Sequence, residues 1–417
     1  MTEWREVKLE NVCIKITDGS HWSPKSQESG YPMASVKDMG ESELDLSSCR
    51  KISKTDFEEL VRQDCKPKVG DVLIAKDGSY LKQIFDVKNE QDVVILSSIA
   101  IIRPNKQSVT PRFLKYVFKN PTFQEMVSNN YVSGAVIPRI VLKDFRKIAF
   151  PLPPLEIQGK IAGILGALDD RIDVLRRENV VLEQMAQAVF QSWFVDFDIV
   201  RAKAAGTPES EVREKYHITP ELYALFPSAL TPDNLPLGWE KKKLGDVILC
   251  FDSKRIPLSK KQREEMKGGV PYYGATSIVD YVNKEIFDDV YLLMGEDGSV
   301  IDENGKPFLQ YIWGKAWINN HAHVLQGKRM VSTETLYLFL KNFNIRPYVT
   351  GAVQAKLNQQ NMNSIPFVYA SESIHNIFHE RISSFFSKIR CNTEQTRTLE
   401  QTRDALLPKL MNGEIEV

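Results

Sequence analysis

Two long stretches of the chain carry apolar residues at steps that alternate between four and three, the spacing of an α-helix that buries one stripe. The first stretch follows Pro151–Pro154, and the second ends near the C-terminus. Each helix is expected to run for about 38 residues, or about 57 Å at ~1.5 Å per residue. The stripe positions are Ile161, Leu165, Leu168, Ile172, Leu175, Asn179 and Leu182 in the first helix, and Phe378, Ile382, Phe385, Ile389, Asn392 and Leu399 in the second.

These stripes must be covered by another element, because one helix cannot bury its own stripe. We therefore expect the two helices to pair with each other, antiparallel, as a coiled coil. Asn179 and Asn392 occupy stripe positions, where a polar side chain fixes the register of a coiled coil at some cost in stability. The alternative is that the helices stay separate and each packs on its own domain.

A segment of mixed pattern precedes each helix. Val69–Lys76 and Val93–Arg103 are apolar runs bounded by Gly, Asp and Pro, as is typical of buried strands. Val290–Met294 and His321–Leu325 are their expected counterparts in the second half. We therefore expect each helix to follow a domain with a buried sheet.

A short helix is expected after the strands of the first segment. Thr110 and Pro111 have the residue types of a helix N-cap and a first helical residue. Phe113, Leu114, Val117 and Phe118 are expected on one side of this helix, and Arg112, Lys115 and Lys119 on the other.

The chain repeats itself. Trp4–Val12 and Trp239–Val247 share the spacing Trp-x3-Lys-Leu-x2-Val, and Val132–Ile140 matches Val349–Leu357. The offset of the second match continues unchanged into the long helices, which is unlikely by chance. Between these matches, Asp77-Gly78-Ser79 corresponds to Asp297-Gly298-Ser299. Units of this length are too long for a solenoid repeat, so they indicate a duplicated domain.

The predicted organisation is α+β, with two similar mixed α/β domains joined by two long antiparallel coiled-coil helices and related by a pseudo-two-fold axis. In chain order the parts are a first domain at 1–154, a first helix at 155–195, a linker at 196–236, a second domain at 237–370 and a second helix at 371–412.

The charge of the chain is balanced, with 54 basic and 54 acidic residues in 417. This balance argues against a bulk nucleic-acid coat. The strongest local excess is Arg103–Lys147, with nine basic and two acidic residues. Such a block can face phosphates, although an excess of this size is also ordinary surface variation.

The cysteines and the apolar runs favour the cytoplasm. The five cysteines are scattered and form no CxxC pair, which indicates reduced thiols. Apolar runs such as Val93–Ile102 are too short to cross a bilayer, and the N-terminus has no leader pattern.

Motifs for catalysis were sought and not found. The chain has no Gly-x-Gly-x-x-Gly, no Gly-x4-Gly-Lys-Ser/Thr, no Asn/Asp-Pro-Pro-aromatic and no Gly-x-Ser-x-Gly. Asn376 stands where a metalloprotease motif needs a glutamate. We expect neither a metal site nor catalysis. The weaker sets that could hold a metal or cut DNA are His321 with His323, His375 with His379, and Asp297 with Glu303 and Lys306.

Several stretches together, from Trp4 to about Gly413, resemble the specificity subunit of type I restriction–modification enzymes. The second copy departs from the pattern where Ile365-Pro366 stands for the first copy's Phe150–Pro154, and His375 for Gln158. The stretches that carry the resemblance are Asp18–Pro24, Ile148–Ala162, Phe190–Asp198, Leu235–Trp239, Gly295–Ser299 and Asn319–Leu325.

The resemblance implies a DNA-recognising subunit without catalysis of its own. Each mixed domain is then a target recognition domain that recognises one half of a split double-stranded DNA site. The two helices act as a spacer, and their outer faces at Gln158–Phe194 and Ile374–Leu410 dock methyltransferase subunits, of which two are expected. S-adenosylmethionine, ATP and magnesium belong to partner subunits, including restriction subunits where these are present.

The expected DNA contacts lie in loops around the duplicated motifs. Bases are recognised by Arg or Lys at guanine and by Asn or Gln at adenine. The alternative for each side chain is an ordinary solvated position. The candidates are Ser20, His21, Lys76, Tyr80, Lys82, Ser133 and Arg139 in the first domain, and Lys254, Arg255, Tyr273, Thr276, Asn319, Gln354 and Lys356 in the second.

Two other functions are considered beside this one. The first is a nuclease or methyltransferase with unrecognised motifs. The second is a coiled-coil scaffold that binds only protein. Activity of the purified chain on DNA would favour the first, and loss of DNA retention by the partner complex would favour the second.

Overall fold

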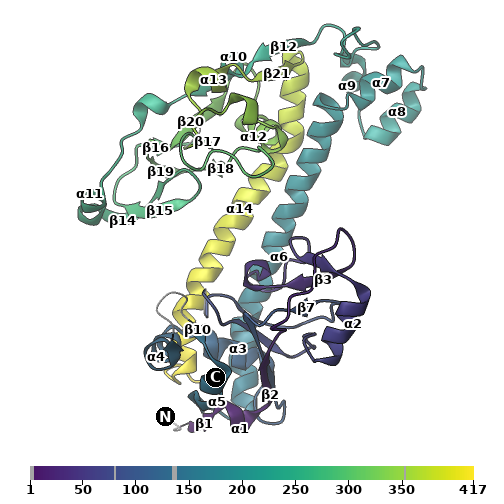
Figure 1. Cartoon of the computed structure of the whole chain (residues 1–417). Helices are drawn as coiled ribbons and strands as arrows, with labels where there is room; N and C mark the ends of the chain where they lie inside the picture. Colours follow the sequence, from purple (N-terminus) through teal and green to yellow (C-terminus); the bar gives the residue numbers. More distant parts are fainter. Residues whose placement is uncertain (1–3, 79–80, 134–138, 352–353) are drawn as a thin grey trace. The chain divides into compact units, whose positions relative to one another are not determined.

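The computed structural model describes residues 4–78, 81–133, 139–351 and 354–417. The chain forms two compact units: unit 1 joins the residues up to Arg176 with Glu394–Val417, and unit 2 is Arg177–Thr393. The two long helices, α6 (Leu155–Phe194) and α14 (Glu372–Met411), each contribute one end to each unit (Figure 1). Every unit therefore contains one mixed domain and a pair of helix ends.

The domain of unit 1 is built on a four-stranded antiparallel sheet in the order β2-β8-β5-β6. Its central strand β5 is buried on both faces, as its continuous apolar run predicts. A second sheet, β4-β3-β7, adjoins it, and two short pairs, β1-β11 and β9-β10, complete the domain. The strands are β1 (Arg5–Lys8), β2 (Cys13–Asp18), β3 (Tyr31–Ala34), β4 (Arg50–Ile52), β5 (Val72–Ala75), β6 (Ile84–Asp86), β7 (Val94–Ile95), β8 (Ile99–Pro104), β9 (Val132–Ser133), β10 (Arg139–Ile140) and β11 (Ala149–Leu152).

The run Val93–Arg103, expected as one strand, is two strands in different sheets. A turn closed by the Ile99 N–H to the Leu96 carbonyl separates β7 from β8. The apolar pattern hides this turn because both strands are buried on both faces. The helices of unit 1, besides the long pair, are α1 (Leu9–Val12), α2 (Lys54–Arg62), α3 (Pro111–Lys119), α4 (Pro121–Tyr131), α5 (Leu142–Lys147) and the 3-10 turn η1 (Val36–Asp38).

Helix α3 begins as expected, with the Thr110 hydroxyl accepting the Phe113 N–H and Pro111 in its first turn. Lys115, on the basic side of α3, is buried, and its ammonium lies 2.8 Å from the Asp169 carboxylate of α6. The lysine anchors the domain to the long helix, so this side of α3 does not face solvent.

Asp169 holds several partners in unit 1. Tyr116 donates to it at 2.7 Å, and Arg403 of α14 donates at 3.0 Å. Burial opposes the charge of Asp169, but Lys115 and Lys119 outweigh that effect and hold its pKa well below the usual range. The domain of unit 1 is thus fastened to both long helices by one ionised carboxylate.

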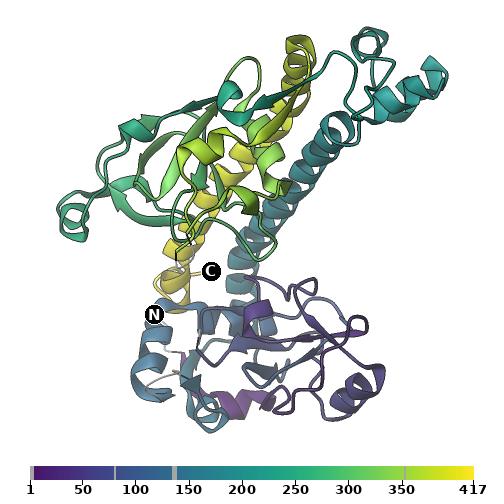
Figure 2. The ribbon, with the colours of Figure 1, turned by 45° about the horizontal axis from the view of Figure 1, so that its top comes forward.

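Unit 2 repeats the plan of unit 1. Its four-stranded sheet has the order β13-β20-β17-β18, and a second sheet has the order β15-β14-β19-β16. The hairpin β14–β15, with α11 beside it, projects from the unit in both views (Figures 1 and 2). The strands are β12 (Glu240–Lys243), β13 (Ile248–Cys250), β14 (Lys267–Tyr273), β15 (Ile278–Val282), β16 (Phe287–Asp288), β17 (Tyr291–Gly295), β18 (Leu309–Ile312), β19 (Lys315–Ile318), β20 (Ala322–Gly327) and β21 (Pro366–Tyr369). The helices are α10 (Leu244–Val247), α11 (Lys260–Glu265), α12 (Thr333–Asn342), α13 (Gln359–Asn363) and the 3-10 turns η2 (Asp252–Lys254) and η3 (Arg346–Tyr348).

The duplication holds at the level of strand register. Lys8 lies opposite Ala149 in the pair β1-β11, and Lys243 lies opposite Pro366 in the pair β12-β21. The next N–H donates across the pair in both units, from Leu9 at 2.8 Å and from Leu244 at 2.7 Å. The two domains are therefore copies of one fold, although the chain that links these strands differs.

The long helices pair within each unit, and the pairing is antiparallel. In unit 1 the first turns of α6, with Ile161 and Leu165, share a buried cluster with Leu407 and Leu410 from the end of α14. In unit 2 the end of α6 packs on the beginning of α14. Because the beginning of one helix meets the end of the other in both units, the alternative of separate helices is wrong.

Asn179 and Asn392 face each other in unit 2. The Asn392 side chain is fully buried and donates to Asn179 Oδ1 at 3.0 Å, while the Asn179 amide donates to Thr393 Oγ1 at 3.2 Å. This contact matches the register role expected of two stripe asparagines.

The stripe of α14 drifts from the predicted positions. Phe385 is half-buried, whereas Phe386 is 1% exposed and packs edge-on against Tyr311 of β18 at 5.2 Å. The domain competes with α6 for the apolar side of α14, and helical spacing alone does not reveal that competition.

The segment expected as a linker contains three short helices, α7 (Asp198–Ala204), α8 (Glu209–Tyr216) and α9 (Pro220–Leu225). Phe226, which follows α9, packs edge-on against Trp193 of α6 at 5.2 Å. Among the described residues, no helix combines the length and apolar character that crossing a bilayer requires.

Replacing Phe378 tests the helix pairing in unit 2. Phe378 is fully buried, and its ring lies 6.0 Å from that of Phe190. We expect Phe378→Ala to lower the free energy of unfolding of this unit by about 3–5 kcal/mol, because it leaves a cavity between the helices. Val181→Ala, on the exposed side of α6, is the matched control and should cost below about 0.5 kcal/mol. Urea unfolding followed by tryptophan fluorescence measures both, and equal costs would contradict the pairing.

Candidate nucleic-acid interface

Two motifs found twice in the sequence meet in both units. In unit 1, Asp77 forms a β-bridge with Arg139, and in unit 2, Asp297 forms one with Lys356. The main chain beside each bridge is also paired, from the Ile140 N–H to the Lys76 carbonyl at 3.0 Å and from the Leu357 N–H to the Glu296 carbonyl at 2.8 Å. Each domain therefore holds an Asp-Gly loop against a segment that presents an exposed cation.

Beneath the bridge of unit 1 lies a small ionic cluster. The Lys76 ammonium is buried and lies 3.3 Å from the Asp18 carboxylate and 3.5 Å from the Asp77 carboxylate. This position differs from the exposed one expected for a DNA contact. Lys76 ties the end of β2 to the Asp-Gly loop.

Unit 2 has a larger network in the same place. Asp252 Oδ2 accepts from His323 Nδ1 at 2.6 Å and from the Gln359 amide at 2.7 Å, and Asp252 Oδ1 accepts from the Val324 N–H at 2.9 Å. Arg255 adds a bond to Glu296 at 2.6 Å. These contacts hold the loops after β13 and β17 to strand β20.

Both ring nitrogens of His323 have oxygen partners in this network. The Nε2 atom lies 2.8 Å from the Leu357 carbonyl oxygen, and the Nδ1 atom lies 2.6 Å from the Asp252 carboxylate. The ring is therefore held in one orientation by its two neighbours. Burial alone would raise the pKa of Asp252, but the bonds from His323, Val324 and Gln359 together lower it to about 2.

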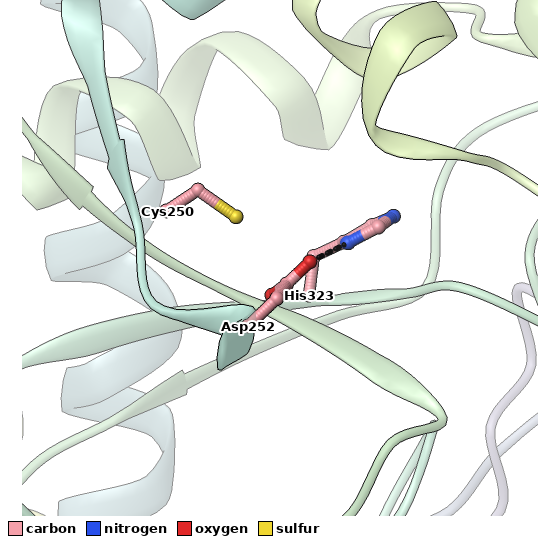
Figure 3. Close-up of side chains that lie close together, drawn as sticks. All are labelled: Cys250, Asp252 and His323. Atoms are coloured by element: carbon pink, nitrogen blue, oxygen red, sulfur yellow. Dashed lines mark hydrogen bonds and ion pairs between the residues drawn. The ribbon is translucent and has the colours of Figure 1, made fainter. Parts of the chain in front are cut away.

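Cys250 lies close to this pair, and the three groups have the residue types of a metal site. Their ligand atoms lie within 4.8 Å of one another. Figure 3 shows that Asp252 and His323 contact each other, whereas the sulfur of Cys250 stands apart from both. Burial raises the pKa of the Cys250 thiol to about 11, which keeps it a neutral thiol. Because the carboxylate and the imidazole already bond each other, the arrangement is that of a structural hydrogen-bond network.

His321 and His323, expected to point the same way, do not. Strand β20 begins at Ala322, so the two-residue period of a strand does not reach His321. Its ring lies in solvent, 2.5 Å from the Asp297 carboxylate, whereas His323 is fully buried.

The structure separates the predicted contact residues by their exposure. Four are used within the domain: Ser20, Lys76 and Asn319 are buried, and the Arg255 side chain is 10% exposed in its ion pairs. Tyr273 is half-buried, Ser133 lies in β9, and Tyr80 falls outside the described residues. The exposed candidates are His21, Lys82, Arg139, Lys254, Thr276, Gln354 and Lys356.

The exposed cations lack acidic partners while the acids near them are paired. No ion pair involves Lys82, Arg139 or Lys356 within the described residues, whereas Asp77 pairs with Lys76 and Asp297 lies beside the His321 ring. Sequence reasoning identified the motifs but missed these pairings, since it does not show which side chains turn inward.

Comparison with known proteins places this fold in a family. Residues 1–184 and 236–401 match the model of the type I restriction modification DNA specificity domain. The chain belongs to this family, whose members recognise DNA and are not the catalytic subunits, so the interpretation as an unrecognised nuclease or methyltransferase is not retained.

Two relatives and one solved structure agree with the assignment. The HindI specificity subunit of Haemophilus influenzae is 28% identical over 84% of this chain and 87% of its own length. The MjaIX specificity subunit of Methanocaldococcus jannaschii is 25% identical over 75% of this chain and 71% of its own length. An S subunit from M. genitalium shares the fold with a TM-score of 0.54 at 15% identity, over 98% of this chain and 96% of that one.

The two His–Asp pairs of unit 2 provide a matched test of the buried network. Asp252→Asn removes the buried carboxylate that accepts from Gln359 and the Val324 N–H and bonds the His323 ring, so we expect it to cost about 3–5 kcal/mol of stability at pH 7. Asp297→Asn, at the exposed pair, should cost below about 1 kcal/mol.

The difference in stability between Asp252→Asn and the wild type should depend on pH. The pKa of Asp252 is lowered by folding, so its stabilisation is complete above the ordinary carboxyl range and is lost as the pH falls from about 4 towards 2. Thermal unfolding across this range should show the two proteins converging. A constant difference would contradict the assigned charge states.

Proposed function

We propose that this chain is the DNA-recognising subunit of a type I restriction–modification complex, with each mixed domain recognising one half of a split site. The observation that carries the proposal is the duplicated bridge, which presents an exposed cation beside an Asp-Gly loop in both domains. Such loops suit a groove in which phosphates and base edges alternate. Two copies in one chain suit a site of two halves.

The long helices are proposed to set the gap between the halves. Each runs for 40 residues, and they pair in both units. The contact between Asn179 and Asn392 supports a fixed register, because a slip of either helix would leave a buried amide unpaired.

The outer face of α6 is proposed to dock methyltransferase subunits, of which we expect two. In unit 2 the face carries Val180, Val181 and Met185, which are 55%, 53% and 47% exposed. In unit 1 it carries Val174, which is 51% exposed. Apolar side chains gathered on one helix mark an interaction surface more than scattered ones do. Within the described residues, α14 shows no large apolar side chain of comparable exposure.

The chemistry is assigned to the partner subunits. We propose that methyltransferase subunits bind S-adenosylmethionine, that restriction subunits, where present, use ATP and magnesium, and that the assembly works in the cytoplasm. The paired carboxylates and histidines described above then serve to shape the recognition loops.

Mapping methylated adenines in a genome, with and without this chain beside its methyltransferase subunits, tests the proposal. We expect a motif of two halves and a fixed gap that appears only with the chain. Alanine at Lys82, Arg139, Lys254 and Lys356 together should abolish the methylation and weaken duplex binding roughly tenfold or more, because phosphate contacts are lost. Alanine at the exposed Lys54 and Lys215 is the matched control. Native methylation by the quadruple variant would refute the interface.

A charge on the exposed face of α6 tests the docking. Val181→Asp should prevent copurification with the methyltransferase subunits, since a buried unpaired carboxylate costs several kcal/mol at an apolar interface. Val279 of β15 is exposed to the same extent as Val181, and Val279→Asp should leave the complex intact. A Val181→Asp chain that still copurifies with its partners would place the docking surface elsewhere.

A further inference from the structure

Two aspartates hold equivalent positions at the end of the first strand of the core sheet: Asp18 is the last residue of β2, and Asp252 lies two residues after the end of β13. The Asp-Gly-Ser motif lies two residues after Ala75 in unit 1 and two residues after Gly295 in unit 2. Ala75 pairs with Ile99, and Gly295 pairs with Ala322, so these partners are equivalent.

The same register extends to the first strand. Counting three residues along from Ile99 and Ala322 makes Ile102 equivalent to Leu325. Ile102 pairs with Ile16, and Leu325 pairs with Cys250, so Ile16 is equivalent to Cys250. Two residues further on, Asp18 is therefore equivalent to Asp252.

Four residues beyond each aspartate stands a large apolar side chain in solvent. Trp22 is 50% exposed and Ile256 is 48% exposed. By contrast, Trp193, Trp239 and Trp317 are between 2% and 7% exposed, and Trp4 and Trp313 are half-buried. The two domains thus present an apolar side chain at the same place, although the loop sequences differ.

The loop that carries Trp22 is fastened to the core. The Ser20 hydroxyl donates to the Trp22 carbonyl at 2.7 Å and accepts the Trp22 N–H at 3.0 Å. The Ser20 N–H donates to the Ile95 carbonyl at 2.8 Å, and a Cβ at Gly19 would lie 2.1 Å from that same oxygen. Only glycine allows this approach, so the loop is held tightly while its tryptophan points outward.

The loop that carries Ile256 is held by different bonds. The Trp317 indole N–H donates to the Ile256 carbonyl at 2.7 Å, and the Tyr272 hydroxyl accepts the Leu258 N–H at 3.0 Å. Arg255 donates to the Ala322 carbonyl at 2.7 Å. Because this loop is fixed on both sides of its exposed apolar residue, little conformational entropy is lost when a partner buries that residue.

We propose that Trp22 and Ile256 are specificity-determining residues that make the apolar base contact of their respective domains. This inference rests on the proposed function. In unit 1 the loop begins at Asp18, which pairs with Lys76 beside the Asp-Gly loop, and in unit 2 Arg255 within the loop pairs with Glu296 beside the Asp-Gly loop. Each loop is therefore fastened to the motif that forms the bridge with Arg139 or Lys356. A duplex placed on those cations brings base edges or base steps to the apolar side chains.

The two side chains suit different base contacts. A tryptophan stacks on a base at an opened step, which tolerates several bases, and apolar side chains inserted at such steps are known to kink DNA. An isoleucine packs against a base edge that is itself apolar, such as the methyl group of thymine. One position in the fold therefore gives the two half-sites different preferences.

Single substitutions in the full complex with its methyltransferase subunits test the proposal. The probe is a duplex carrying the mapped site, compared with a duplex in which both halves are scrambled. Trp22→Ala should weaken binding to the site roughly 10- to 100-fold, the cost of one base–aromatic stack. Ile256→Ala should weaken it about five- to tenfold, because less surface is buried. Ile14→Ala and Val279→Ala are matched controls, since both are exposed apolar residues of the same two units.

The salt dependence separates an apolar base contact from a phosphate contact. Both variants should keep the wild-type slope of log affinity against log salt, because neither residue neutralises a phosphate. Arg139→Ala should reduce that slope by about one.

A second measurement uses the fluorescence of Trp22. Subtracting the emission of Trp22→Phe from that of the wild type isolates the Trp22 signal, and the specific duplex should quench this signal.

The outcomes distinguish this inference from the proposed function. If the wild-type complex shows no preference for any split site, the proposed function fails. If the wild type is selective but Trp22→Ala and Ile256→Ala bind like the controls, the base-contact proposal alone is overturned. Loss of the methyltransferase subunits with normal DNA binding would also overturn it, because the loops would then be protein contacts.

Discussion

The apolar seam between α6 and α14 is the interaction on which both units depend. The domain of unit 1 does not enclose its core alone, since Ile161 and Leu165 of one helix and Leu407 of the other complete it. In unit 2, Phe190 and Phe378 form a cluster with the short helices that follow α6, and Leu338 of the domain is buried in that cluster. Because each helix supplies one end to each unit, loss of the helices would expose buried apolar side chains in both. The recognition loops are thus built on a scaffold whose helices are part of the fold.

Much of this fold could be predicted from spacing, because period and repetition are local properties of a sequence. The heptads, the antiparallel pairing and the facing asparagines Asn179 and Asn392 followed from them. Two features were missed for different reasons: Val93–Arg103 was expected as one strand, because burial on both faces hides the turn inside it. The burial of Lys115 and Phe386 depends on Asp169 and Tyr311, partners distant in the chain that decide which side of a helix is covered.

The candidate interface was predictable to the level of its loops. The duplicated motifs located Arg139 and Lys356, and the structure brings each against its Asp-Gly loop. The exposure of single side chains was not predictable. Lys76 and Arg255 are of residue types that often contact DNA, but both pair with acidic residues inside the domain. Trp22 and Ile256 were missed because their equivalence rests on strand register, which sequence identity between the loops does not reveal.

The ionic clusters under the two bridges show how such a domain can change its loops. Lys76 and Glu296 occupy equivalent positions before the Asp-Gly motif and carry opposite charges. Asp18 balances the lysine, and Arg255 balances the glutamate. The charged residue before the Asp-Gly motif is therefore paired in both copies, although the residues that form the pair differ. A buried charge must keep a partner, but the partner can come from either loop. Loops that satisfy this constraint in different ways carry different side chains, which is what the proposed recognition of two unlike half-sites requires.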